Sequence, residues 1–102
     1  MILRQGDVLL IRDESNPKPG KKISREGGRV ILAHGELTGH AHAIKAKGAE
    51  LFEFDDLDRL LKVVKPVALE HEEHDTVRLP PGNYRIRIQK EYSPEALRNV
   101  AD

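Results

Sequence analysis

The chain is constrained most by its short apolar segments, which are separated by turn-forming residues along its length. These segments lie at positions 8–11, 30–32, 40–45, 51–54, 60–64, 67–69, 76–79 and 84–89. Segments this short are typical of strands, and in the last of them Tyr84, Ile86 and Ile88 alternate with polar residues. The sequence therefore predicts an all-β fold, mainly antiparallel, in the form of a small barrel or sandwich.

Turn signals support this division, and two stretches stay ambiguous. Residues 80–82 read Pro-Pro-Gly, a tight turn in which proline presets φ and glycine accepts a positive φ. Residues 13–28 are polar and irregular, which suits a mobile flap, a binding loop or an unrecognised hairpin. Residues 60–64 favour a strand broken by Pro66, although the acidic turn at 55–58 would also suit the start of a short helix.

One helix is expected, at the C-terminal end. Ser93 has the side-chain oxygen of an N-cap, Pro94 suits the first helical position, and Glu95 places an acid in the first turn. We therefore predict a short C-terminal helix from residue 93 to about residue 100. It would complete a single β-rich domain spanning residues 1–102.

Composition excludes several kinds of chemistry. The chain has no cysteine, so any bound metal must take nitrogen or oxygen ligands, and a cysteine nucleophile is excluded. Lysine plus arginine equals aspartate plus glutamate at 17 each, so no overall charge favours nucleic acid. No segment suits a signal peptide or a membrane span. We therefore expect a cytoplasmic protein without membrane contact.

The first of two histidine pairs is His40 and His42. All five histidines of the chain lie between residues 34 and 74. In an extended strand His40 and His42 would share a face, about 6.5–7 Å apart along the backbone, so their rings can converge on one ion.

The second pair is His71 and His74, which lie among carboxylates at positions 70, 72, 73 and 75. A straight strand would point these two side chains to opposite faces, so both reach one centre only if the segment turns. Their spacing is one residue shorter than the i, i+4 pair of helical zinc proteases, which excludes that motif.

Other interpretations of the histidines stay open. A histidine beside glutamate on a loop is often only solvated, and His71 also suits a core position in which it donates to a backbone carbonyl. A metal-free histidine centre, for catalysis or for ligand binding, is a further alternative.

Four strings resemble a family of small uncharacterised bacterial proteins. They are Gln5-Gly6-Asp7-Val8-Leu9-Leu10, Gly39-His40-Ala41-His42, Leu69-Glu70-His71-Glu72-Glu73-His74 and Leu79-Pro80-Pro81-Gly82-Asn83-Tyr84. The resemblance would span nearly the whole chain, and it implies no particular function.

A second resemblance is to the cupin barrels, which hold a metal with a His-x-His pair, a downstream glutamate and a later histidine. Gly35, His40 and His42 are similar to the start of the first cupin motif, with the glycine one residue too close and no glutamate in the expected place. Residues 75–82 are similar to the second motif, but Arg85 stands where its histidine is expected. In a cupin-like barrel, His71 or His74 would have to replace the missing ligands.

The leading functional hypothesis is a divalent-metal site. Its expected ligands are His40, His42, His71 and His74, with Glu70, Glu72 or Glu73 as an oxygen ligand or as a partner that orients a ligand. Imidazole ligands suit zinc, nickel, copper or iron. Three histidines with an open position would permit catalysis, whereas a closed set of four would be structural, so an enzymatic role is neither predicted nor excluded.

The rival hypotheses need no metal. In one, the protein is an interaction module that docks a partner protein or a second copy through its 13–28 loop and an edge strand such as 84–89. In the other, it is a small-molecule-binding barrel whose histidines act as hydrogen-bond donors.

Overall fold

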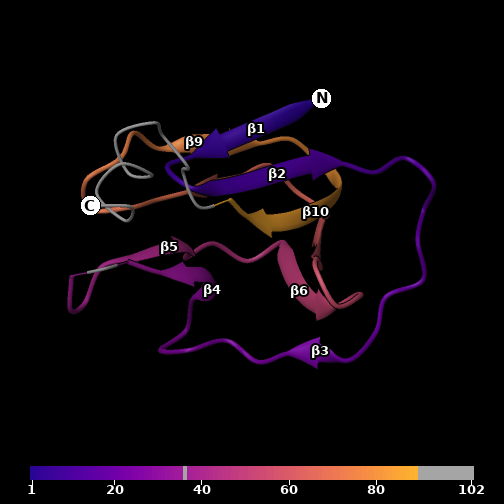
Figure 1. Cartoon of the computed structure of the whole chain (residues 1–102), viewed down its shortest axis with the longest axis horizontal. Coiled ribbons are helices and arrows are strands. Elements are labelled where there is room, and N and C mark those ends of the chain that lie inside the picture. Colours follow the sequence, from indigo (N-terminus) through magenta and orange to yellow (C-terminus); the bar gives the residue numbers. More distant parts are fainter. Residues whose placement is uncertain (36, 90–102) are drawn as a thin grey trace, which may run out of the picture.

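A computed structural model describes residues 1–35 and 37–89, and the regular structure within them consists entirely of strands (Figure 1). The strands are β1 (Ile2–Gln5), β2 (Val8–Arg12), β3 (Lys22–Ile23), β4 (Val30–His34), β5 (Ala41–Ile44), β6 (Ala49–Glu53), β7 (Arg59–Val63), β8 (Val67–Leu69), β9 (Val77–Leu79) and β10 (Gly82–Ile88).

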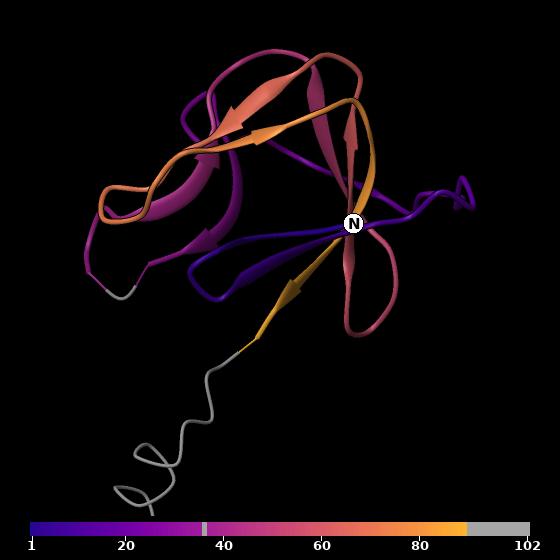
Figure 2. The ribbon, with the colours of Figure 1, turned by 90° about the horizontal axis from the view of Figure 1, so that it is seen from above.

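The strands form three antiparallel sheets. The largest has six strands in the order β1-β2-β10-β7-β6-β3, and the other two are the pairs β4–β5 and β8–β9. Figure 1 shows β1, β2 and β10 close together, with β3 far from them across the molecule. The β8–β9 pair, in orange, lies above the indigo strands β1 and β2 in the view of Figure 2.

One apolar core joins the three sheets. It takes side chains from every strand between β4 and β10 and from β2. Tyr84 is the largest fully buried side chain, and its hydroxyl donates to the carbonyl oxygen of Pro80 at 2.7 Å, so the phenol is buried without losing its hydrogen bond. Each fully buried leucine or isoleucine of this core contributes roughly 1.5–3 kcal/mol relative to an exposed one.

Each strand segment expected from the sequence overlaps an observed strand, and the alternative helix after residues 55–58 is wrong because β7 begins at Arg59. Two strands were not expected. β1 pairs along its whole length with β2, and β3 is only two residues long, held in the sheet by β6. The irregular 13–28 stretch therefore contains a sheet strand, followed by a tight turn in which Gly27 and Gly28 have positive φ.

The predicted β-rich fold with a closing helix is corrected to an all-β fold over the described residues. The expected C-terminal helix at 93–100 lies outside them. The described part of the chain accordingly holds no helix long and apolar enough to cross a membrane.

The prediction of an edge strand at 84–89 is also wrong. β10 pairs with β2 on one side and with β7 on the other, so its backbone groups are used within the sheet. The edges of the long sheet are β1 and β3.

Candidate functional site

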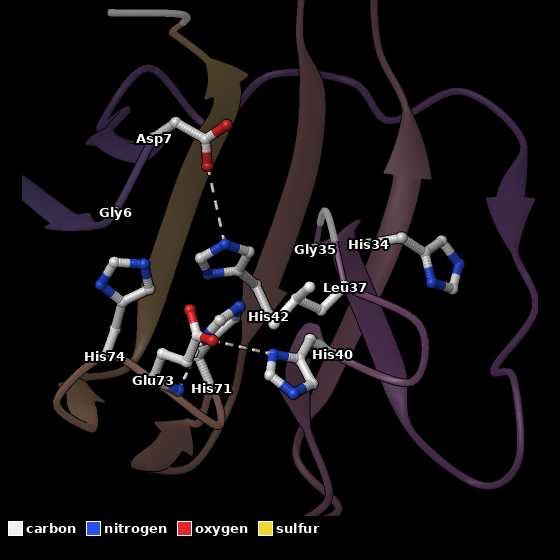
Figure 3. Close-up of a pocket in the computed structure, with 10 residues that line it drawn as sticks. All are labelled: Gly6, Asp7, His34, Gly35, Leu37, His40, His42, His71, Glu73 and His74. Carbon is white, nitrogen blue, oxygen red and sulfur yellow. Dashed lines mark hydrogen bonds and ion pairs between the residues drawn. The ribbon is translucent and has the colours of Figure 1, made fainter.

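A pocket of about 820 Å³ opens where three separate segments meet (Figure 3). These segments are the turn between β1 and β2, the strand β5 with the residues before it, and the connection between β8 and β9. The pocket is lined by Gly6, Asp7, His34, Gly35, Leu37, His40, His42, His71, Glu73 and His74. Five histidines thus line a single pocket, including all four that the sequence nominated.

Hydrogen bonds between β5 and the end of β8 bring the two histidine pairs together. Ala43 and Glu70 exchange two backbone hydrogen bonds, each 2.9 Å long. One step further, the backbone N–H of Ala41 donates to the carboxylate of Glu72 at 2.9 Å. That hydrogen bond is the main reason that the pKa of Glu72 lies below its usual range. Glu72 therefore fixes backbone instead of pointing a free carboxylate into the pocket.

Three imidazole rings pack together inside the pocket. Their ring centroids are separated by 4.3 Å between His42 and His71, 4.7 Å between His71 and His74, and 5.7 Å between His42 and His74. The connection after β8 bends at residues 72–74, as the sequence argument required for His71 and His74 to converge. Figure 3 shows these rings grouped at the centre and left of the pocket.

His42 is the buried member of the group and is fixed by Gln5. The side-chain amide nitrogen of Gln5 donates to two backbone carbonyls, those of Leu69 and Asp75, at 2.9 Å each. Its amide oxygen must therefore face Nδ1 of His42, 2.8 Å away, and can only accept. We assign the proton of neutral His42 to Nδ1, which leaves the lone pair of Nε2 directed away from Gln5.

The pKa of His42 lies below its ordinary value, mainly because the ring is buried and also because His71 is close to it. His42 has only 3% of its surface exposed. Two neighbouring imidazoles disfavour a positive charge on one another, so the pocket favours the neutral form of His42, which can ligate a metal or accept a proton.

The neutral ring of His71 is the opposite tautomer to that of His42. Its Nδ1 accepts a hydrogen bond from the backbone N–H of Glu73 at 3.0 Å. The proton of the neutral ring therefore lies on Nε2, on the side of the ring near Gly35. In this arrangement the pocket contains a lone pair from His42 and an N–H donor from His71.

His40 lies at the edge of this group, just before β5 begins. Among the described residues, its ring contacts that of His71 edge-on, at a centroid distance of 5.9 Å. Its Nδ1 lies 3.5 Å from a carboxylate oxygen of Glu73. His40 and His42 were expected to act as a pair along one strand face. Within the described residues no ring contact joins them.

Two glycines let the imidazoles lie close to the backbone. A Cβ atom on Gly6 would sit 2.7 Å from Nε2 of His74, and one on Gly35 would sit 2.9 Å from Cβ of His40. Neither distance is tolerable for a carbon atom, so larger residues at these positions would displace the histidines. Gly6 also has a positive φ of 59°, which the turn between β1 and β2 requires.

The sequence argument missed Gln5 and Asp7. Both lie in a string that entered the sequence argument only through the family resemblance, and no short-range pattern indicates that this segment lies beside residues 42 and 74. Glu70, a proposed oxygen ligand, lies outside the pocket lining and pairs with Lys45 at 4.0 Å.

The donor atoms do not yet surround one point. Among residues 1–35 and 37–89, no three histidine, aspartate or glutamate side chains are grouped in a geometry that could hold a metal ion. The packing of the rings therefore brings imidazoles together without forming a ready set of ligands.

Comparison with known proteins gives a family and no activity. Residues 4–89 match the family model described as Domain of unknown function (DUF8820), and the chain belongs to this family. No curated protein and no solved structure matches the chain. The resemblance to an uncharacterised family is thus confirmed, whereas no cupin relative is found.

Proposed function

We propose that this DUF8820 protein binds one divalent transition-metal ion in the histidine pocket, with His42, His71 and His74 as nitrogen ligands and His40 as a further ligand at the edge. The observation that carries the proposal is the packing of three imidazole rings with mutual centroid distances of 4.3, 4.7 and 5.7 Å. Three imidazoles bound to one tetrahedral ion have centroids about 5 Å apart.

The surroundings of His42 also support a ligand role. A metal-binding histidine usually donates its second ring N–H to a fixed oxygen, which orients the ring and sets the tautomer. Gln5 supplies such an oxygen at 2.8 Å. A ring that is neutral because of burial also binds a metal without first losing a proton.

Binding requires small movements. His71 has to give up the hydrogen bond from Glu73 and turn, because its Nδ1 is now capped. The residues that would move are accessible: His74 and Glu73 belong to the exposed bend after β8. The pocket volume of about 820 Å³ leaves room for the rings to rotate.

The test is the metal content of untagged protein that was purified without nickel-affinity chromatography. We expect about one equivalent of a single metal, retained or regained after soaking with zinc, and a rise in melting temperature with zinc. His74→Ala is the first variant, because this exposed side chain is not part of the core and its loss should leave the fold intact. It should lose the metal and the thermal shift.

His34→Ala is the matched control. His34 also lines the pocket, but its side chain is 68% exposed and faces Glu26, so this variant should bind metal like the unchanged protein. Metal content near zero after soaking in zinc, nickel and iron would refute the proposal. Equal binding by the His74 and His34 variants would refute the assigned ligands.

A second candidate function, metal-free binding of a small polar molecule, is favoured by the complementary states of His42 and His71. One ring offers a lone pair and the other an N–H donor, which together suit a ligand that both donates and accepts. This function predicts a melting temperature that chelator does not lower. It also predicts that small hydroxy or amide compounds stabilise the protein, and that both His42→Ala and His71→Ala abolish this effect.

A further inference from the structure

The side chain of Asp7 faces the lone pair of His42 across the pocket. Oδ1 of Asp7 lies 3.6 Å from Nε2 of His42. The carboxylate is half-exposed, with 48% of its side-chain surface accessible, so it is held on the pocket side of the β1–β2 turn without being buried. Figure 3 shows Asp7 pointing toward the ring of His42.

This contact is not an ordinary hydrogen bond. The distance of 3.6 Å exceeds hydrogen-bond length. Gln5 moreover keeps the proton on Nδ1 of His42, so Nε2 has none to donate. In the neutral state of His42, two groups that can only accept therefore face each other, and both are satisfied when a metal ion or a donating water molecule lies between them.

The separation suits a metal ion. Two ligand atoms that each lie 2.0–2.2 Å from one tetrahedral ion are about 3.3–3.5 Å apart. The oxygen and nitrogen here are already within a few tenths of an ångström of this value.

The same turn lies against a second imidazole. Gly6 packs so closely on His74 that a Cβ atom there would stand 2.7 Å from Nε2 of that ring. The β1–β2 turn thus lies against two histidines: its Asp7 faces His42 from β5, and its Gly6 packs on His74 from the bend after β8.

From this geometry we infer that Asp7 is an oxygen ligand of the pocket metal and that the centre is a mixed histidine–carboxylate site. The inference rests on the proposed metal-binding function and adds to it the chemical class of the ion. The carboxylate adds a hard oxygen ligand to the imidazoles of the pocket, which suits zinc or ferrous iron, whereas an all-imidazole set would be the more tolerant of copper.

The test compares zinc and cobalt(II) binding by the unchanged protein and by Asp7→Asn, which keeps the size of the side chain and removes its charge. We expect the variant to bind zinc at least tenfold more weakly. The visible spectrum of its cobalt(II) complex should also change, because one charged oxygen ligand is replaced. Asp56→Asn is the matched control, since it removes an exposed carboxylate outside the pocket lining, and it should leave the cobalt spectrum as it was.

The outcomes separate the two proposals. If the unchanged protein binds zinc and Asp7→Asn shows the same affinity and the same cobalt spectrum, the role of Asp7 is refuted and the metal site stands. If the unchanged protein binds neither ion, both proposals fall. Urea unfolding of Asp7→Asn checks that a lost signal does not reflect a lost fold. A second variant, Asp7→Glu, should restore part of the affinity if an oxygen ligand is what matters.

Discussion

Two polar clusters of this protein use their hydrogen-bonding groups in opposite ways. Around Asp58, every side-chain group is paired: Arg87 donates to both carboxylate oxygens at 2.8 and 3.0 Å, and Arg85 lies 3.8 Å from one of them. Arg85 also donates to Asp13 at 2.9 Å. In the histidine pocket, by contrast, Nε2 of His42 meets another acceptor instead of a donor.

The comparison distinguishes polar groups that stabilise the fold from polar groups that can bind a ligand. Asp58 is 2% exposed and His42 is 3% exposed, so burial alone does not distinguish them. What differs is that Asp58 is paired with the guanidinium groups of two arginines, whereas Nε2 of His42 directs an unpaired lone pair into the pocket. A buried polar group whose donors and acceptors are all hydrogen-bonded within the protein stabilises the fold. A buried group with an unpaired donor or acceptor can bind a ligand.

The largest effect that would sharpen this comparison is expected from Asp58→Ala. We expect a loss of about 2 kcal/mol in the free energy of unfolding, less than for a fully buried ion pair because the two arginines return to water. Urea unfolding measures it, with Asp56→Ala as an exposed control. Metal binding should be unchanged in both variants. A change in metal binding by Asp58→Ala alone would break the distinction between the two clusters.

The next effect is expected from Gln5→Leu. This variant removes the oxygen that fixes the tautomer of His42 and should weaken zinc binding about 10–100-fold. The nitrogen chemical shifts of His42 provide an independent readout, since they should move toward the Nε2–H tautomer. Gln89→Leu, on the exposed surface, is the control. An unchanged tautomer would mean that Gln5 is only a structural residue.

The smallest effect concerns pH. Because burial lowers the pKa of His42 below its ordinary 6.5, the unfolded chain takes up this proton at a higher pH than the folded protein does. Stability from this group is therefore fully present above pH 6.5 and is lost as the pH falls below that value. The slope cannot exceed about 1.4 kcal/mol per pH unit for one proton.

The measurement is unfolding of the metal-free protein between pH 7 and pH 5, compared with His42→Gln. The variant should show a shallower decline, since the glutamine can still donate to Gln5 without titrating. Parallel curves for the two proteins would show that His42 contributes nothing to the pH dependence.

The strands could be predicted from the sequence because each is set by its own residues. The alternation around Tyr84 and Ile86 and the glycine at position 82 are sufficient to place β10. β3 could not be found in this way, because its two residues are ordered by pairing with β6 rather than by their own pattern. The helix expected after Ser93 lies outside the described residues, whose regular structure consists of strands.

The candidate site was predictable in its histidines and not in its supporting residues. His71 and His74 could be nominated because they are close in sequence, and a bend was the one condition needed for them to meet. The contribution of Gln5 depends on carbonyl groups at residues 69 and 75, which no sequence pattern links to position 5. A residue of one sheet that orients a ligating side chain of another can be identified only when the arrangement of the sheets is known.

The two backbone hydrogen bonds between Ala43 and Glu70 have a dynamic consequence. They hold β5 to the end of β8, next to the residues that would have to move for the pocket to rearrange. Breaking two such bonds costs roughly 1–3 kcal/mol, far less than unfolding a domain. We expect deuterium to enter these two amides through a local opening, so that their exchange rates record how often β5 separates from the end of β8.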